Sequence, residues 1–446
     1  MKTISTELIK EAIYKLCFEA NTCLDDSVYS KILASYNSTN DKVLKTILQN
    51  AKVAYEKKLP LCQDTGQILV FVEIGQNVQL TGEFLEDAIN SAVENCYIEN
   101  FFRKSVVKNA IFDRDNTKTN TPAIIYTKIV KGDEIKIKIL IKGAGSENKS
   151  KLEMMLPTSS KEEIIEKCAE LILCAGKNAC PPMVVGIGIG GTADKASILS
   201  KEVLVCDEFE QEELELAEKI KNKVNEKGNL ILDVKVKSIA THIACMPVSI
   251  TINCHSDRFS SCTIKGNDVI YHHQKPDFIS FEEIEETKEV YTNDVETIKS
   301  LNIGDEVLLT GEIYVARDMA HKKMLEEKEL PIDIKDKIIF YAGPCPNSPN
   351  RVIGSIGPTT AGRMDKFAVE LYDKGLLATI GKGDRNIDVQ NAIKRNNAKY
   401  FTVIGGVAAL LADTVKKKEI IAYEELGAEA LYLIEVKKLP VKVELS

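Results

Sequence analysis

The chain has no apolar run that approaches the ~18 residues a membrane-spanning helix needs, so we expect no transmembrane segment. It also lacks an excess of basic charge, because 58 Lys and Arg face 66 Asp and Glu and leave a net charge of −8. Bulk attraction to nucleic acid or to an anionic membrane is therefore not expected. A small anionic substrate remains compatible, since a local cluster of Arg and Lys can override the global sign inside a cleft.

A secretory leader and a disulfide pattern are missing as well. The opening segment MKTISTELIKEAIYKLCFEAN has the pattern of an acidic amphipathic helix, without a continuous apolar core or a cleavage site. The twelve cysteines are irregularly spaced in a chain of 446 residues, which is not the pattern of a disulfide scaffold. We therefore expect a cytoplasmic protein whose thiols are free or bound to metal.

The chain is too long for one ordinary domain, and its hydrophobic content of 44% and charged content of 28% are globular values. Helical spacing in residues 1–58 is followed by a β-branched run at 68–74, and strand and helix patterns then alternate. The pattern breaks in the polar segment 265–285, and a new strand and helix pattern begins at Val290. This predicts a mixed α/β protein with a larger N-terminal and a smaller C-terminal domain.

Three cysteines differ from the other nine because of the residues beside them. Cys62 opens CQDTG, Cys180 opens CPPMVVGIGIGG, and Cys254 closes THIACMPVSITINC. They are far apart in the chain, so only the fold can bring them together. Three thiolates without an obvious fourth suit an iron–sulfur cluster that keeps one iron open, and an open iron is a Lewis acid.

Polar residues near these cysteines are candidates for proton transfer and substrate binding. In CQDTG, Asp64 has the chemistry to hydrogen-bond a proton-transfer group, and Gln63 to hold a substrate carboxylate or hydroxyl. The alternative is a polar turn ahead of a strand. His242 precedes Cys254 in the same segment and is a candidate to orient or protonate a leaving group, although a single His is more often structural.

A glycine-rich strand follows Cys180 and contains G-x-G-x-x-G at Gly186, Gly188 and Gly191. A dinucleotide-binding fingerprint is the first interpretation of this pattern. The Cys-Pro-Pro sequence just upstream does not belong in such a unit. We therefore expect these glycines to allow close approach of the backbone to a cluster, with N–H groups donating to its sulfurs.

The C-terminal half carries a candidate anion site in its turns. Cationic and hydroxyl side chains follow apparent strands, in the order Arg317, Thr359, Thr360, Arg363 and Lys382. Any one of the arginines alone is explained by a solvated surface. Together, in Gly- and Thr-rich turns, they predict a carboxylate-binding cradle. Because neither half carries both the thiols and the cradle, we expect the site between the two domains.

Several of these segments together resemble the iron–sulfur hydro-lyases of the class I fumarase and tartrate dehydratase family. The segments are CQDTG, the two other cysteine segments, GEIYVARDMAHKK, YAGPCP, GSIGPTTAGRMD and IGKG. The resemblance implies a hydro-lyase α-type domain at 1–275, a linker at 276–284 and a swivelling β-type domain at 285–446. It also implies a homodimer and a 4Fe–4S cluster with substrate on the fourth iron.

The same resemblance implies roles for individual residues. It assigns Cys62, Cys180 and Cys254 to the cluster. It also places Asp64, His242 and Thr359 in the site, where we expect Thr359 with Asp64 to transfer the proton. His242 would serve the hydroxyl side. The substrate-binding set that it implies is Gln63, Arg103 in FFRKSVV, Gly143 in IKGAGSENKS, Arg317, Thr360, Arg363 and Lys382.

These assignments favour a fumarate hydratase that interconverts fumarate and (S)-malate. A small dicarboxylate would be the substrate, and no nucleic acid or membrane partner is expected. Tartrate dehydratase and mesaconate hydratase are alternatives with the same mechanism, because a methyl or second hydroxyl changes only the pocket shape. A non-catalytic iron–sulfur sensor and a nucleotide-binding dehydrogenase are alternatives from other classes.

Overall fold

The computed structural model describes residues 2–175, 179–228, 230–281, 287–327 and 329–446. Helices and strands are mixed throughout, which confirms the predicted α/β class. The chain divides into two compact units, Met1–Ala51 with Asp64–Phe278 and Lys52–Gln63 with Ile279–Ser446. The predicted linker at 276–284 lies partly outside the described residues, and the predicted domain bounds remain a prediction. In the described part of the chain, no helix has the length and apolar character needed to cross a membrane.

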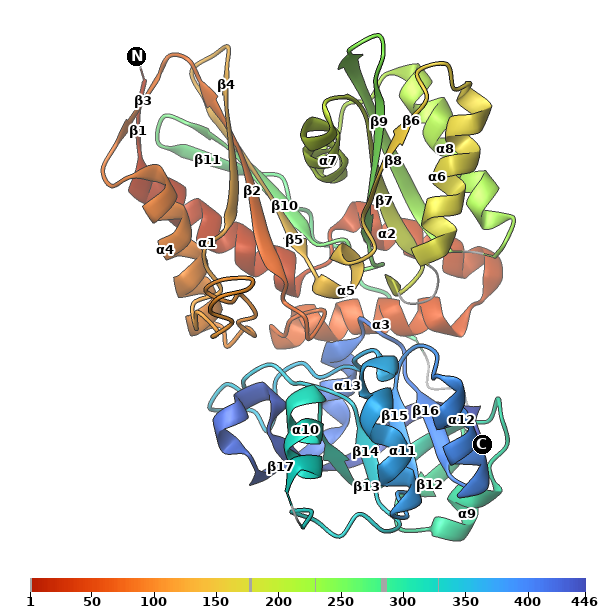
Figure 1. The fold of residues 1–446 in the computed structure, drawn as a ribbon. Coiled ribbons are helices and arrows are strands. Elements are labelled where there is room, and N and C mark those ends of the chain that lie inside the picture. Colours follow the sequence, from red (N-terminus) through yellow and green to blue (C-terminus); the bar gives the residue numbers. More distant parts are fainter. Residues whose placement is uncertain (1, 176–178, 229, 282–286, 328) are drawn as a thin grey trace. The chain divides into compact units, whose positions relative to one another are not determined.

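The first unit contains a five-stranded sheet in the order β11-β10-β5-β2-β4. Helices α1 and α4 cover one face of it (Figure 1). Ile68, Val70 and Val72 pack against these helices, and Leu69 and Phe71 between them are buried too, so both faces of this strand are covered. The elements are α1 (Thr6–Thr22), β2 (Gln67–Gly75), α4 (Leu85–Glu99), β4 (Ile124–Val130), β5 (Ile135–Lys142), β10 (Phe259–Lys265) and β11 (Asp268–Tyr271).

A four-stranded sheet, in the order β6-β9-β7-β8, forms the second half of this unit. Helices α6 and α8 pack on one face and α7 on the other (Figure 1). The elements are α5 (Ala144–Glu147), β6 (Lys151–Met155), α6 (Lys161–Ala175), β7 (Met183–Gly191), α7 (Ala193–Glu202), η2 (Val203–Val205), α8 (Gln211–Asn225), β8 (Ile231–Thr241) and β9 (Met246–Asn253). The remaining elements of the chain's first part are β1 (Lys2–Ser5), α2 (Asp26–Thr39), α3 (Lys42–Lys57) and β3 (Val78–Thr81).

The glycines of β7 have a packing role. A Cβ at Gly186 would overlap the carbonyl oxygen of Ser200, and one at Gly188 would overlap the carbonyl oxygen of Ala196. Both oxygens belong to α7, so these glycines let the helix backbone lie directly on the strand. The interpretation that they serve approach to a cluster is therefore wrong, because the space beside them is filled by α7.

The second unit is built on a seven-stranded sheet in the order β12-β13-β14-β15-β16-β18-β17. Strand β18 pairs with both β16 and β13, so β13, β14, β15, β16 and β18 form a closed ring. The strands are β12 (Glu289–Tyr291), β13 (Glu306–Val315), β14 (Ile338–Phe340), β15 (Ala378–Gly381), β16 (Lys399–Thr402), β17 (Val415–Ala422) and β18 (Leu431–Leu445). The helices are α9 (Val295–Ser300), α10 (Asp318–Glu326), η3 (Ala361–Met364), α11 (Asp365–Asp373), α12 (Ile387–Arg395), α13 (Ala408–Thr414) and η4 (Glu424–Glu429).

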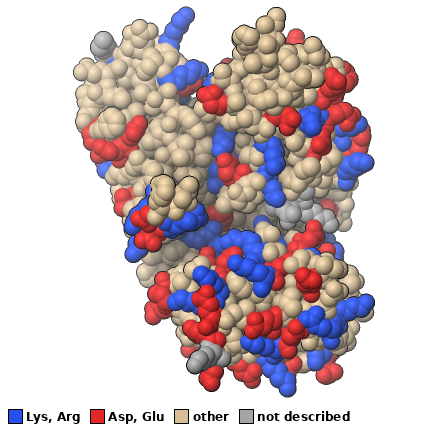
Figure 2. Space-filling model, viewed as in Figure 1, with Lys and Arg blue, Asp and Glu red and all other residues tan. Residues whose placement is uncertain are grey.

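Parallel pairing in this unit decides where its loops meet. Strands β13, β14, β15 and β16 run parallel to one another, so their carboxyl ends share one edge of the sheet. Arg317 follows β13 and Lys382 follows β15, which brings both to that edge. On the face of each unit drawn in Figure 2, basic and acidic side chains are interspersed.

Candidate active site

Asp64 lies at the centre of a polar cluster in the first unit, with Arg103, Gly66 and Ala144 as its partners. Its Oδ1 lies 3.1 Å from Nη2 of Arg103 and accepts a 3.2 Å hydrogen bond from the N–H of Gly66. Its Oδ2 accepts a 2.8 Å hydrogen bond from the N–H of Ala144. Both carboxylate oxygens are thus engaged by donors from three separate segments, which fixes the side chain in one orientation.

The electrostatic surroundings keep Asp64 ionised. Burial acts to raise the pKa of this carboxyl, but Arg103, Arg258 and the N–H groups of Ala144 and Gly66 outweigh burial and leave the pKa below its ordinary value. A carboxylate in this state accepts hydrogen bonds and does not donate a proton at neutral pH. Asp64 therefore has the chemistry of a positioning or proton-accepting partner.

Arg258 belongs to this cluster and was not assigned a role from the sequence. Its side chain is buried, and Nη1 donates a 2.7 Å hydrogen bond to the carbonyl oxygen of Asp64. A Cβ at Gly143 would lie 3.3 Å from Nη2 of Arg258 and 3.4 Å from Oδ2 of Asp64, so glycine leaves room for this arginine. The only signal in the sequence was the position of Arg258 four residues after Cys254.

Lys142 is a second residue that sequence reasoning missed. Its ammonium is buried and donates to Oγ of Ser146 at 3.0 Å and to the carbonyl oxygen of Ile252, with Glu147 at 3.7 Å. Burial lowers the pKa of Lys142 to about 8, while Glu147 and Cys254 oppose that shift. This lysine ties the loop that carries Gly143 to the end of β9, just before Cys254.

The three predicted cluster cysteines are divided between the two units. Cys180 and Cys254 belong to the first unit, where the N–H of His255 contacts the carbonyl oxygen of Cys180 at 3.4 Å. Cys62 folds with the second unit. None of the three is in a disulfide, and Cys62 is buried while Cys180 and Cys254 are half-buried. Over the described ranges, no three His, Cys, Asp or Glu side chains are arranged to hold a metal ion.

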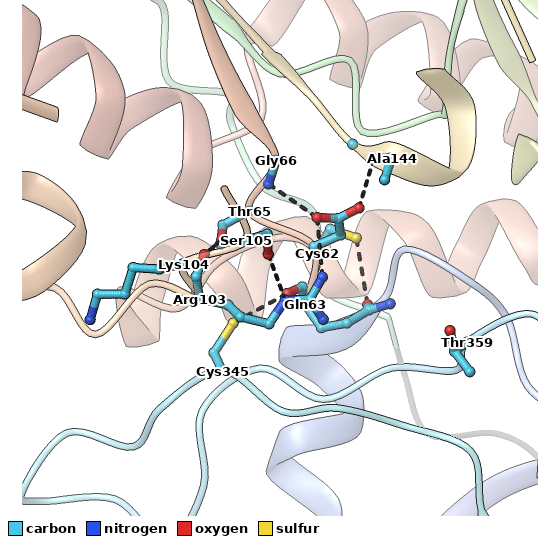
Figure 3. A network of polar contacts seen from close by, with 12 residues as sticks. Cys62, Gln63, Thr65, Gly66, Arg103, Lys104, Ser105, Ala144, Cys345 and Thr359 are labelled. Carbon is cyan, nitrogen blue, oxygen red and sulfur yellow. Dashed lines mark hydrogen bonds and ion pairs between the residues drawn. The ribbon is translucent and has the colours of Figure 1, made fainter. Parts of the chain in front are cut away.

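Gln63 is held by loops of the second unit (Figure 3). Its Nε2 donates to the carbonyl oxygen of Pro358 at 3.4 Å, and its Oε1 accepts from the Cys62 thiol at 3.5 Å. A thiol–carbonyl contact of 3.5 Å also joins Cys345 to the backbone of Gln63. In the sequence, Thr359 follows Pro358 and Asp64 follows Gln63.

The predicted cradle residues of the second unit come together at the edge where the parallel strands end. The N–H of Ala361 donates to the carbonyl oxygen of Lys382 at 2.8 Å, and the N–H of Lys382 donates to that of Thr359 at 3.2 Å. Thr360 and Lys382 form a parallel bridge. The hydroxyl segment and the lysine segment are therefore adjacent strands of backbone.

The two arginines of this edge contact carboxylates of their own unit. Arg363 pairs with Asp318 through Nε to Oδ1 at 3.0 Å and Nη2 to Oδ2 at 2.8 Å. Nη2 of Arg317 lies 3.4 Å from Oε1 of Glu429. The first arrangement is the bidentate geometry by which arginine pairs with a carboxylate.

His242 lies apart from the Asp64 cluster within the first unit. It sits exposed in the turn between β8 and β9, where its Nδ1 accepts from the N–H of Ala244 at 3.1 Å. Cys254 follows the other end of β9. This strand has 8 residues, and a strand of that size is roughly 26 Å long. The structure does not bring His242 to Asp64, and its catalytic role remains a prediction.

The fold and these clusters define an α/β protein whose loops carry arginines paired with carboxylates, a lysine, adjacent threonines and cysteine thiols. Residues 10–263 match the model of the family described as fumarate hydratase (fumerase), and residues 267–446 match that of the fumarase C-terminus. Both matches together span nearly the whole chain. The chain belongs to the fumarate hydratase (fumerase) family.

Individual relatives agree with this assignment. The chain is 32% identical to the anaerobic class I fumarate hydratase of Escherichia coli (strain K12), over 98% of this chain and 87% of that protein. It is 32% identical to the mitochondrial fumarate hydratase 1 of Leishmania major, over 90% and 81% respectively. It is 35% identical to a candidate L(+)-tartrate dehydratase subunit alpha of Methanocaldococcus jannaschii, over 58% of this chain and 98% of that protein.

Proposed function

We propose that this chain is a class I fumarate hydratase, a hydro-lyase that adds water reversibly to fumarate to give (S)-malate. The observation that carries the proposal is the similarity to fumarate hydratases over 98% of the chain. Hydration forms one C–O bond and one C–H bond across the double bond, and the reverse reaction breaks both. The residues of this chain must therefore bind two carboxylates and move one proton.

We assign carboxylate binding to Arg317, Arg363 and Lys382, with Gln63, Arg103, Gly143 and Thr360 completing the substrate set. The bidentate contact between Arg363 and Asp318 supports this, since a substrate carboxylate would meet the same donors. When the C–H proton is removed, negative charge builds on the adjacent carboxylate. Fixed cationic donors stabilise that charge, and the loss of one such donor typically costs about 3 kcal/mol of barrier.

We assign proton transfer at the carbon to Oγ1 of Thr359 with the Asp64 carboxylate as its partner. A threonine hydroxyl is a weak base by itself and needs an acceptor for its proton. Asp64 is ionised, because Arg103 and Arg258 hold its pKa below its ordinary value against the effect of burial, so its carboxylate can accept a hydrogen bond from that hydroxyl and orient it. We keep His242 as the candidate for the hydroxyl side on the sequence motif alone. Within the first unit it does not lie at the Asp64 cluster.

We further propose that Cys62, Cys180 and Cys254 hold a 4Fe–4S cluster. The donor set fits such a group, since three thiols outside any disulfide leave one iron open. When bound, the open iron would supply Lewis-acid activation of the substrate's hydroxyl and carboxylate oxygens. A homodimer and a cytoplasmic location are further predictions. Light scattering of the purified protein tests the oligomeric state.

An L-tartrate dehydratase is the second candidate, because 58% of the chain is 35% identical to a candidate tartrate dehydratase subunit. A single hydroxyl changes discrimination by only about 1–3 kcal/mol in a pocket that does not bind it. Anaerobic protein reconstituted with iron and sulfide is mixed separately with malate, tartrate and mesaconate, and the formation or loss of the unsaturated acid is followed. We expect the highest kcat/KM with malate and fumarate. Turnover of tartrate without turnover of malate would support the second candidate.

A further inference from the structure

A buried arginine lies directly beneath the carboxylate-binding edge of the second unit. The side chain of Arg385 is 0% exposed, and its Nε lies 2.6 Å from Oδ1 of Asp365. Its Nη1 donates to Oγ1 of Thr379 at 3.1 Å. The guanidinium also lies 5.4 Å from the ring centre of Tyr341 and 5.1 Å from that of Tyr400. Burial on all sides means that Arg385 does not touch a substrate.

The partners of Arg385 are the anchor points of the two functional loops. Asp365 begins α11 directly after η3, which carries Arg363. The other Asp365 oxygen, Oδ2, accepts a 2.7 Å hydrogen bond from the N–H of Asn386. One carboxylate thus clamps the segment that follows Lys382 onto the end of the segment that carries Thr359 and Arg363.

A second buried contact holds the lysine loop closer to Lys382. The hydroxyl of Tyr400, on β16, donates to the carbonyl oxygen of Gly383 at 2.8 Å. Gly383 has a φ of +81°, a conformation that glycine adopts without strain. The backbone that follows Lys382 is therefore fixed at two points, Gly383 and Asn386, by buried polar groups that were not assigned any role.

We propose that Arg385 is a positioning residue that, through Asp365, fixes the register of Lys382 against Thr359, Thr360 and Arg363. The expected effect on catalysis rests on the proposed function. The expected effect on the position of the two loops rests only on the contacts of Arg385 and Asp365. Removing the clamp would leave the charged side chains present while letting the two loops shift. Shifts of ~1 Å away from the reacting geometry reduce turnover by about 100-fold.

The direct test replaces the pair by apolar side chains of similar size, Arg385→Met with Asp365→Leu. Such double replacements of a buried ion pair usually preserve folding, whereas single ones leave an uncompensated charge. We expect kcat to fall about 10- to 100-fold while KM changes by less than about threefold. Leu439→Ala, a core truncation in β18 of the same unit, is the matched control for loss of stability and should leave kcat of the folded protein unchanged. An unchanged kcat in the double variant would overturn the proposal.

Tyr400→Phe provides a second variant in case the double variant does not fold. It removes only the hydroxyl that donates to Gly383. We expect a smaller decrease in kcat, about 3- to 10-fold, with little change in thermal midpoint. Full activity in this variant, together with full activity in Arg385→Lys, would contradict a positioning role for the buried cluster.

Hydrogen–deuterium exchange separates this inference from the proposed function. We expect faster exchange in the double variant at the N–H groups of Ala361 and Lys382, which hold the two loops together. The strand β13 should exchange as in the wild type. Equal protection at both loops would overturn the inference even in an active enzyme. If the wild type did not hydrate fumarate, the proposed function would fail, and the exchange result would still decide the positioning role.

Discussion

The guanidinium of Arg363 holds the carboxylate of Asp318 through two parallel contacts, Nε to Oδ1 at 3.0 Å and Nη2 to Oδ2 at 2.8 Å. The arginine side chain is half exposed, so a substrate carboxylate has access to it. A lysine keeps the charge at this position but loses the two-pronged geometry. Arg363→Lys therefore tests whether a substrate carboxylate needs the geometry of this arginine in addition to its charge.

Arg363→Lys is expected to lower kcat/KM for fumarate by about 100-fold, because one bidentate contact to the charge-bearing carboxylate is lost. The matched control is Arg395→Lys. Arg395 makes a similar pair with Asp373, Nε to Oδ1 at 2.9 Å and Nη2 to Oδ2 at 2.5 Å, between α11 and α12. Steady-state kinetics of both variants provide the test. Equal activity of the two variants would remove Arg363 from the substrate-binding set.

Asp64→Asn is expected to lower the free energy of unfolding at pH 7 by about 2 kcal/mol, because charge-assisted hydrogen bonds become neutral ones. The folded-state pKa of Asp64 is lowered from 3.8, with Arg103 and Arg258 outweighing burial. The stabilisation is therefore fully present above pH 3.8 and is lost as the pH falls through the folded value. Urea unfolding of wild type and variant at several pH values measures the difference. A stability difference between wild type and Asp64→Asn that stayed the same below the folded-state pKa of Asp64 would contradict this prediction.

Lys142→Met is expected to change the pH dependence of stability in alkaline solution. Burial lowers the pKa of Lys142 from 10.5 to about 8, so the fold disfavours its charged form. That cost is fully present below pH 8 and disappears as the pH rises from 8 to 10.5, so wild type should gain stability relative to the variant over this range. Lys136→Met, at an exposed position of the same strand, is the control and should show no such gain. Parallel stability curves for wild type and Lys142→Met would show that Lys142 titrates normally.

Gly188→Ala is expected to destabilise the first unit by about 1–3 kcal/mol, because its Cβ would overlap the carbonyl oxygen of Ala196 and must push α7 off β7. Gly145→Ala is the control, since a Cβ there meets nothing within 4 Å. Thermal unfolding of both variants tests this. A wild-type midpoint for Gly188→Ala would show that the helix does not pack against the strand backbone.

The sequence predicted the features that depend on local patterns. The β-branched apolar run at 68–74 predicted β2, and the clean alternation in IKIKILIK predicted β5. The turn residues after β13 and β15 predicted Arg317 and Lys382 at strand ends. Both lie at one edge because the strands are parallel.

Features set by contacts between distant segments were not predictable. Lys142 lies on the same face of β5 as Lys136 and Lys138, so the alternating pattern predicts that it faces solvent. In the fold, the carbonyl oxygen of Ile252 and the α5 loop cover it. The GIGIGG segment has the same letters whether a helix or a cofactor lies beside it, and only the fold shows that α7 does. The association of residues 52–63 with the C-terminal unit likewise depends on contacts such as Ser355 to the carbonyl oxygen of Pro60.

The cysteines provide the remaining prediction. Cys62→Ser, Cys180→Ser and Cys254→Ser should each abolish bound inorganic sulfide and visible absorption, because each removes one of three ligands. Cys168→Ser should retain both, since Cys168 lies on the buried face of α6 and burial raises its pKa to about 12. Normal absorption in any of the first three variants would remove that cysteine from the ligand set.

The most direct measurement is the acid-labile sulfide content of the wild-type protein purified without oxygen, determined on the same sample as its rate of fumarate hydration. The account predicts sulfide equivalent to one cubane cluster per chain and turnover that disappears when the cluster is removed. Fumarate hydration by protein that contains no inorganic sulfide would contradict it.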